Sequence, residues 1–379
     1  MNLPKKVYSD LTLCNRCRCG FCRIGCVSNS ILGIESLSAR GRNAIALSLL
    51  DGLVDVSQGL AERVFLCTTC GFCRERCPLK VDSVKIVENL RAELVEKSFT
   101  RPEHDAFSKR IEEVHNPYGE PHEERMKWLP PEVKVAEKAD TAYFVGCTTA
   151  YRRPEIADAT VKILDAAGVN FVVLHPEEWC CGSPTLRVGR RGLFLKLAKH
   201  NVEALRKAGV KRVVTSCAGC YRTLSQDYPE FVGELPFKIL HTSELIADLL
   251  KEGRLKLTRE VPETVTYHDP CHLSRHTGTY EQPREVLESI PSIKLVEMPR
   301  NRETALCCGA GGGVKSGFPD FAMQAALERV KEAHEVGATT ITSACPFCAH
   351  NLKEAIRKAA SPLKFYDLTE LVLKAIKKC

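Results

Sequence analysis

Ten cysteines of this chain fall into two sets of five with nearly the same spacing. In each set a single cysteine is followed by an adjacent pair within Cys-Cys-Gly and then by a Cys-x2-Cys unit. The intervening segments contain 32, 35 and 2 residues in the first set and 35, 36 and 2 in the second. A pattern that recurs over such lengths indicates a duplicated, domain-sized unit. The sets are Cys147, Cys180, Cys181, Cys217 and Cys220, and Cys271, Cys307, Cys308, Cys345 and Cys348.

Each set offers more thiols than an ordinary metal site uses. A structural zinc ion takes four ligands, and so does a cubane [4Fe–4S] cluster. Five thiolates that include two chain neighbours favour a larger or irregular iron–sulfur cluster, and the glycine after each pair would allow a sharp turn beneath it. Zinc in one of the two units is the alternative, because Cys-x2-Cys with two further thiols would satisfy it.

Two further cysteine motifs lie near the N-terminus. The second, CTTCGFCRERCP, is the Cys-x2-Cys-x2-Cys-x3-Cys-Pro run of ferredoxins that hold cubane clusters. In two-cluster ferredoxins the fourth cysteine of such a run ligates the other cluster. We therefore expect one cubane on Cys26, Cys67, Cys70 and Cys73, and the other on Cys77 and three cysteines of the first motif.

The first motif, CNRCRCGFCRIGC, departs from the usual spacing. Counting back from Cys22 reaches Cys19, but the next ligand position holds an arginine. Five cysteines are present where four are needed. Cys14 and Cys22 are predicted ligands besides Cys26, while Cys17 and Cys19 compete for the remaining place.

The surrounding residues describe an ordinary soluble globular protein, with 44% hydrophobic and 27% charged residues. Twenty cysteines among 379 residues are unusual. Since no apolar leader opens the sequence, we expect a cytoplasmic protein whose thiols bind metal and do not form disulfides. No apolar run approaches the length of a membrane span, so any membrane association is expected to be peripheral, through a partner. The formal net charge is +7, but no dense basic tract points to nucleic acid.

The N-terminal part is predicted to be a helical module with two cubane clusters. Residues 38–50, with Ser38 as N-cap, and residues 81–97 both have apolar residues at helical spacing. This predicts an α-helical ferredoxin domain over residues 1–99. Residues 100–138 are rich in proline and charge and are expected to be a connecting segment.

From residue 139 onward, predicted strands alternate with predicted helices, which indicates an α/β fold. Strands such as TAYFVGC and TTITSACPFC run directly into cysteines. Both five-cysteine sets should therefore lie at the carboxyl edges of parallel sheets, where binding sites collect. We expect two tandem domains, 139–260 and 261–379, that face each other across a pseudo-twofold axis.

These motifs resemble those of the heterodisulfide reductase family, and residues 10–379 are similar to its fused iron–sulfur catalytic component, the D subunit. Related iron–sulfur subunits serve glycolate oxidase and anaerobic glycerol-3-phosphate dehydrogenase. The resemblance implies a noncubane [4Fe–4S] cluster on each five-cysteine set, also called a CCG motif. It further implies a redox partner, either a membrane cytochrome b-type subunit or a flavoprotein.

Two functions are compatible with this resemblance. The first is the reduction of a small (hetero)disulfide at the noncubane clusters with electrons delivered through the cubanes. The second is electron transfer within a flavin-dependent 2-hydroxy-acid (lactate or glycolate) or glycerol-3-phosphate dehydrogenase complex. All ten cysteines are present, which favours the first.

Disulfide reduction also needs proton donors and contacts to the substrate. His268, His272 and His276 in HDPCHLSRH lie closest in sequence to a predicted ligand and are candidate proton donors, with a structural role as the alternative. Four arginines are candidate contacts for an anionic substrate, with solvated surface as the alternative. They are Arg187, Arg190, Arg191 and Arg275.

Overall fold

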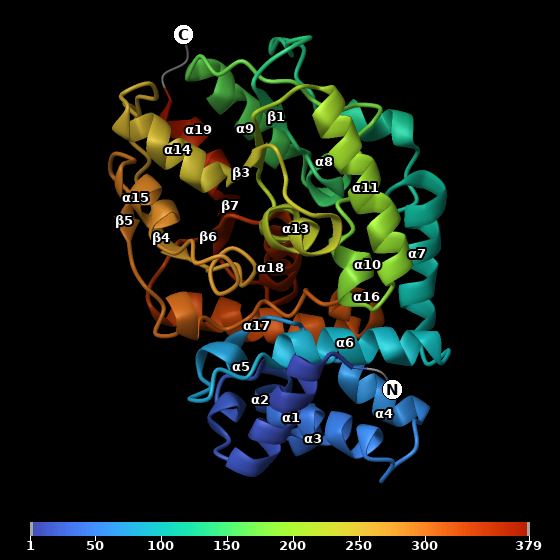
Figure 1. Cartoon of the computed structure of the whole chain (residues 1–379). Helices are drawn as coiled ribbons and strands as arrows, with labels where there is room; N and C mark the ends of the chain where they lie inside the picture. Colours follow the sequence, from blue (N-terminus) through green and yellow to red (C-terminus); the bar gives the residue numbers. More distant parts are fainter. Residues whose placement is uncertain (1–2, 377–379) are drawn as a thin grey trace.

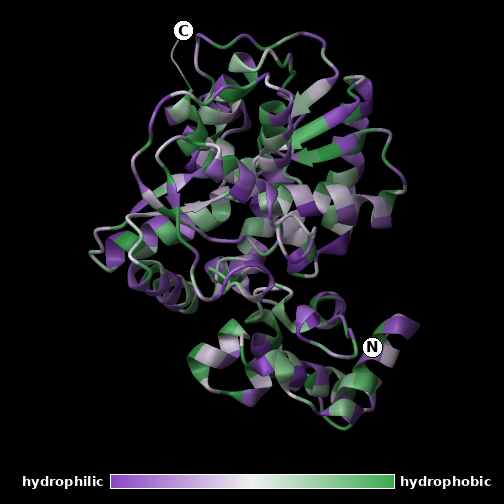
Figure 2. Cartoon of the chain, turned by 90° about the vertical axis from the view of Figure 1, so that its left-hand side faces the viewer, coloured by the Kyte–Doolittle hydropathy of each residue, from purple (hydrophilic) through white to green (hydrophobic). Residues whose placement is uncertain are grey.

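The computed structural model describes residues 3–376, so the outermost ends of the first and last predicted domains lie outside it. A helical lobe lies below a larger α/β lobe, and both views show this division (Figure 1, Figure 2). Within the described residues, no helix is both long and apolar enough to cross a membrane.

The helical lobe forms because short amphipathic helices cover one small core. Ser38 accepts a hydrogen bond from the Gly41 amide at the start of α3, as predicted for an N-cap, and Asp82 caps α6 in the same way. Leu11, Val64 and Leu90 are fully buried between these helices. The helices are α1 (Lys5–Cys17), α2 (Val27–Leu32), α3 (Ala39–Leu50), α4 (Gln58–Phe65), α5 (Phe72–Glu75) and α6 (Ser83–Glu96).

The connecting segment contains a helix that was not predicted, α7 (Pro102–Val114). Pro102 occupies its first turn, where proline fits without loss of a hydrogen bond. Phe107 and Ile111, four residues apart, are buried against the first α/β domain. The segment is therefore a packed wall of the α/β lobe, visible as α7 beside α10 and α11 in Figure 1.

The first α/β domain has a parallel sheet in the order β1-β2-β3. Its strands are β1 (Thr141–Tyr143), β2 (Arg212–Thr215) and β3 (Lys238–His241). Val172 adds one parallel bridge beside β1, so the strand predicted there is only an isolated pairing. The helices are α8 (Cys147–Arg152), α9 (Pro154–Ala166), α10 (Ser183–Arg187), α11 (Arg191–Lys207), α12 (Ala218–Arg222), α13 (Tyr228–Val232) and α14 (Thr242–Lys251).

The second α/β domain has a four-stranded parallel sheet in the order β5-β4-β6-β7. Its strands are β4 (Thr264–Tyr267), β5 (Lys294–Leu295), β6 (Thr340–Ser343) and β7 (Lys364–Asp367). Its helices are α15 (Gln282–Glu288), α16 (Val314–Gly317), α17 (Pro319–Glu335), α18 (Pro346–Lys358) and α19 (Leu368–Ala375). Single helical turns of 3-10 or π type lie at Phe21–Arg23, Glu35–Leu37, His122–Met126, Thr223–Asp227 and Arg302–Thr304.

The two sheets repeat one strand order once the bridge at Val172 is counted as the counterpart of β5. The last strand of each, β3 and β7, was not predicted from the sequence. Both lead directly into a helix with a capping box, at His241 and Asp367. One hydrophobic core runs through both domains and includes Val161 of α9 and Val372 of α19. The predicted α/β class with a helical N-terminal module is confirmed.

Candidate metal centres

One cavity of about 260 Å³ between the two α/β domains is lined by nine of the ten repeated cysteines. They are Cys147, Cys180, Cys181, Cys217, Cys220, Cys271, Cys308, Cys345 and Cys348. Cys307 is not part of this lining. Its thiol is a hydrogen-bonding neighbour of Cys70 in the helical lobe.

The parallel sheets explain why the two sets meet. Cys147 and Cys217 follow the carboxyl ends of β1 and β2, and Cys345 follows that of β6 in the other sheet. The carboxyl ends of parallel strands share one edge of a sheet, and here the two edges face the same space. Cys217 and Cys345, from different domains, are hydrogen-bonding neighbours across it.

Both Cys-Cys-Gly turns require their glycine. Gly182 has φ +81° and Gly309 has φ +88°, a backbone conformation that other residues rarely adopt. A Cβ atom on Gly182 would lie 2.7 Å from the Phe194 ring, and one on Gly309 would lie 2.6 Å from the Ala325 Cβ. Neither position can accommodate a side chain, as the sharp turn predicted from the sequence demands.

The chemistry of the lining fits iron–sulfur clusters. In the described part of the chain no aspartate or glutamate lines the cavity, so its metal-binding atoms are chiefly sulfurs. The Sγ atoms of Cys181 and Cys220 lie 3.4 Å apart. Hydrogen bonds from the Cys180 and Cys220 thiols lower the pKa of Cys181 to about 6, which favours the thiolate that binds metal.

Arg125 places a positive charge beside Cys147, a contact that the sequence did not reveal. Its Nη1 lies 3.6 Å from the Cys147 Sγ, and its Nη2 pairs with the Glu178 carboxylate at 2.5 Å. Glu178 also accepts hydrogen bonds from the amides of Val145 and Gly146, at 2.9 and 2.8 Å. Burial by itself would lower the pKa of Arg125, but Glu178 and Cys147 outweigh it and raise that pKa. The guanidinium therefore stays charged next to the thiol.

His268 lies beside two thiols of the second set. Its Nδ1 accepts a hydrogen bond from the Arg329 Nε at 3.1 Å, which leaves Nε2 as the ring nitrogen that carries a proton. The ring donates to the Cys308 thiol, and one nitrogen lies within 4.8 Å of the sulfurs of Cys308 and Cys348. His268 thus donates a hydrogen bond to a sulfur of the second set but is not itself part of the cavity lining.

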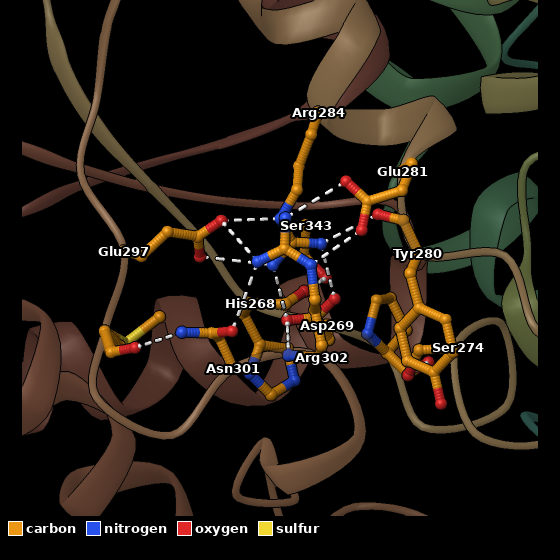
Figure 3. Close-up of polar contacts among 12 residues, drawn as sticks. His268, Asp269, Ser274, Tyr280, Glu281, Arg284, Glu297, Asn301, Arg302 and Ser343 are labelled. Carbon is orange, nitrogen blue, oxygen red and sulfur yellow. Dashed lines mark hydrogen bonds and ion pairs between the residues drawn. The ribbon is translucent and has the colours of Figure 1, made fainter.

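A buried charge network holds the loop that carries His268 and Cys271. Figure 3 shows Arg284 between the carboxylates of Asp269 and Glu297. Its two terminal nitrogens donate to Asp269 at 2.9 and 3.0 Å, and its Nε donates to Glu297 at 2.5 Å. The amide of Arg302 donates to the same aspartate at 2.9 Å. Two parallel bonds between guanidinium and carboxylate fix orientation as well as distance.

The other two candidate histidines differ in position. His272 lines the cavity, and its Nε2 accepts from an Arg222 nitrogen at 3.3 Å. His276 instead donates its Nε2 proton to the Thr69 carbonyl of the helical lobe, at 2.9 Å. Burial, reinforced by the charge of Arg222, lowers the pKa of both rings well below the ordinary value.

None of the four candidate arginines presents an unpaired guanidinium to the cavity. Arg187 lines it but is paired with the buried carboxylates of Glu88 and Asp227. Arg275 donates to the carbonyls of Cys70 and Ala305, at 2.8 and 2.7 Å. Arg190 and Arg191 are bonded to Asp105 and Asn89. The expectation that these side chains bind a substrate anion has no support in this geometry.

The helical lobe brings its cysteines together in two groups. Cys26, Cys67, Cys70 and Cys73 line one small cavity and are called the inner thiol group. Cys14, Cys17, Cys19, Cys22 and Cys77 line a second cavity, which Cys73 also borders, and are called the outer thiol group. Cys17 and Cys19 are both exposed and both reach this second cavity, so the choice between them stays open.

Comparisons with known proteins agree with this division of the chain. Residues 10–81 match the family described as 4Fe-4S dicluster domain. Residues 141–225 and 265–353 each match the Cysteine-rich domain called CCG, which confirms the duplication. This combination defines an iron–sulfur oxidoreductase.

The relatives identify the family more closely. The chain is 44% identical to the D subunit of the dihydromethanophenazine:CoB–CoM heterodisulfide reductase of Methanosarcina barkeri, over 82% of this chain and 77% of that protein. It is 34% identical to the B subunit of the fumarate reductase (CoM/CoB) of Methanothermobacter marburgensis, over 83% of this chain and 62% of that protein. The chain therefore belongs to the D-subunit family of heterodisulfide reductases.

Other similarities are broader. The probable iron-sulfur-binding oxidoreductase FadF of Bacillus subtilis is 34% identical over 83% of this chain and 47% of its own length. A hypothetical protein from Helicobacter pylori has a similar structure with a TM-score of 0.59 and 11% identity, covering 100% of this chain and 74% of that one. At that identity the similarity concerns the fold alone.

Proposed function

We propose that this chain reduces a low-molecular-weight disulfide in the cavity between its two α/β domains. The observation that carries the proposal is that both five-thiol sets open into the same space, so that one small substrate can touch both. The D-subunit relatives belong to an enzyme whose name specifies a CoB–CoM heterodisulfide. Electron transfer within a dehydrogenase complex is the alternative, but it gives no role to a shared thiol-lined cavity.

The ten repeated cysteines are the proposed ligands of two noncubane [4Fe–4S] clusters, and those of the helical lobe are the proposed ligands of two cubanes. When bound, these clusters would supply the two electrons that, with two protons, convert a disulfide into two thiols. Arg125 and His268 donate hydrogen bonds to Cys147 and Cys308, which stabilises negative charge on the sulfurs. The repeated strand order supports a pseudo-twofold relation between the two domains.

The helical lobe is the proposed electron supply. Cys70 of its inner thiol group neighbours Cys307 of the second five-cysteine set. Electrons would therefore reach the second α/β domain before the first. His272, which lines the cavity, is the proposed hydrogen-bond donor to the sulfurs of the cleaved disulfide.

A redox partner protein is proposed to dock on the outer thiol group. All large hydrophobic side chains that are exposed among residues 3–376 lie between Tyr8 and Leu79. Phe21 and Leu79, 50% and 45% exposed, flank the cysteines of this group. Exposed apolar surface of this kind is typical of an interface. A membrane cytochrome b-type subunit or a flavoprotein would fit this role.

An anaerobic assay tests the proposal directly. The purified holoprotein is given a reduced viologen dye and a mixed disulfide, and dye oxidation and free thiols are both measured. Two thiols should appear for every two electrons taken from the dye, and Cys345→Ser should abolish this turnover. A wild-type protein with about 16 iron atoms per chain, the content of four clusters, that oxidises the dye no faster with disulfide present would sink the proposal.

A further inference from the structure

The thiol-lined cavity opens to solvent along the connecting segment. Arg110 of α7 and Ser316 of α16 are the exposed members of its lining, and Pro117, Tyr118 and Phe347 are half-buried. The cysteines lie at the inner end and are buried, apart from the half-buried Cys271. A substrate would therefore enter past α7 and the loop that follows it.

Arg110 is held in place on this rim by its own neighbours. Its Nε donates to the Pro117 carbonyl at 2.9 Å. Its stem lies over Gly119, where a Cβ atom would come within 2.9 Å of the Arg110 Cδ. Within residues 3–376 the two terminal nitrogens have no hydrogen-bond acceptor and no carboxylate partner. The guanidinium is thus oriented but has two nitrogens free for a ligand.

The other charges of the lining make Arg110 distinctive. No carboxylate among residues 3–376 lines the cavity, so none of them competes there for the guanidinium. Arg187 is engaged by Glu88 and Asp227, and the His272 ring accepts a hydrogen bond from Arg222 at 3.3 Å. Within the described lining, Arg110 is the one cation without a partner. The same lining includes the apolar side chains of Phe107 and Phe347.

We infer that Arg110 binds an anionic group of the disulfide substrate and so selects disulfides with a negatively charged end. The anion would sit at the rim, a short apolar stem would pass Phe107 and Phe347, and the sulfur–sulfur bond would lie at the cysteines. The planar fork of arginine suits carboxylate, sulfonate and phosphate groups, which accept two parallel hydrogen bonds. This inference rests on the proposed disulfide reduction and assigns a specificity-determining residue to it.

Two test substrates of the same length distinguish the effect of substrate charge from that of substrate shape. 3,3′-Dithiodipropionate carries a carboxylate at each end, and 3,3′-dithiodipropanamide replaces each with an uncharged amide. The anaerobic holoprotein is assayed with both at constant ionic strength. In Arg110→Gln the ratio of kcat/KM for the dianion to that for the diamide should fall tenfold to about a hundredfold, mainly through KM. Arg110→Lys should lie between, because lysine keeps the charge and loses the fork.

Lys109→Gln is the matched control. Lys109 is the exposed neighbour on the same helix, lies outside the cavity lining and makes only a surface pair with Glu113 at 3.8 Å. Its replacement should leave the ratio unchanged. If Arg110→Gln lowers kcat/KM for both disulfides equally, or matches the control, the assignment of Arg110 is overturned. If the wild type reduces neither disulfide, the proposed function fails and this inference fails with it.

Discussion

Replacing Arg91 with methionine should loosen the helical lobe from the two α/β domains. Arg91 lies in α6, which runs along the boundary between the lobes (Figure 1), and its side chain is fully buried. It donates to the carbonyls of Val64, Phe65 and Cys67 within the helical lobe at 2.6 to 3.2 Å. It also donates to the backbone carbonyl of Arg187 in the first α/β domain at 2.7 Å and to that of Gly312 in the second at 2.9 Å.

The magnitude follows from these bonds and from the cost of burying the charge. Each hydrogen bond from a charged donor contributes about 1.5 kcal/mol at the lower end of the usual range. Burial lowers the pKa of Arg91 to about 10, which corresponds to a cost of about 3 kcal/mol. Two of these bonds cross the lobe boundary. When about one third of the burial cost is subtracted from their contribution, they stabilise the docking of the lobes by about 2 kcal/mol. The separated state should therefore become roughly thirtyfold more populated.

Amide hydrogen exchange on the anaerobic holoprotein measures this opening. Arg42→Met is the matched control, because Arg42 is 1% exposed and donates to Arg63, Leu66 and Ser28, all within the helical lobe. The control should raise exchange only inside that lobe. Arg91→Met should also raise exchange around residues 187–190 and 311–313 and slow electron delivery from reduced dye to disulfide. Equal exchange at these segments in the two variants would refute the reasoning.

Two other predictions concern the neighbouring glycines Gly312 and Gly313. Gly312→Ala should lower the apparent free energy of urea unfolding by about 2 kcal/mol more than Gly253→Ala does. Both glycines have a positive φ, but only at Gly312 would the added Cβ meet a neighbour, the Cys67 carbonyl oxygen at 2.5 Å. Equal losses in the two variants would contradict this. Burial lowers the pKa of His104 to about 4, while its Nε2 is bonded to the Gly313 carbonyl at 2.9 Å. Its contribution to stability is therefore complete above the unfolded pKa of about 6.5 and is lost as pH falls toward 4, by about 2 kcal/mol between pH 7 and 5. Urea unfolding of wild type and His104→Gln at both pH values checks this, and an equal pH dependence in the two would argue against it.

Much of the candidate site was accessible from the sequence because it depends on local spacing. The gaps around Cys180-Cys181 and Cys307-Cys308 revealed the duplication, since both copies keep the same order of cysteines. Strand patterns that end at Cys147 and Cys345 predicted a location at the sheet edge, because parallel strands share their carboxyl edge. Helical spacing and the Ser38 cap likewise predicted the helical lobe.

The tertiary structure decided what no local pattern encodes. The helix α7 was not predicted, because its segment is rich in proline and charged residues. Phe107 and Ile111 have the i, i+4 spacing that could have indicated it. The meeting of Cys70 with Cys307 joins residues more than two hundred positions apart, and Arg125 reaches Cys147 only through the fold. Nothing in the segment HDPCHLSRH distinguishes the roles of its three histidines. In the structure His268 bonds to the Cys308 thiol, His272 lines the cavity and His276 contacts the helical lobe. Spacing along the chain sets which thiols are available, whereas packing between distant segments sets which of them share a cavity and which charges remain free beside it.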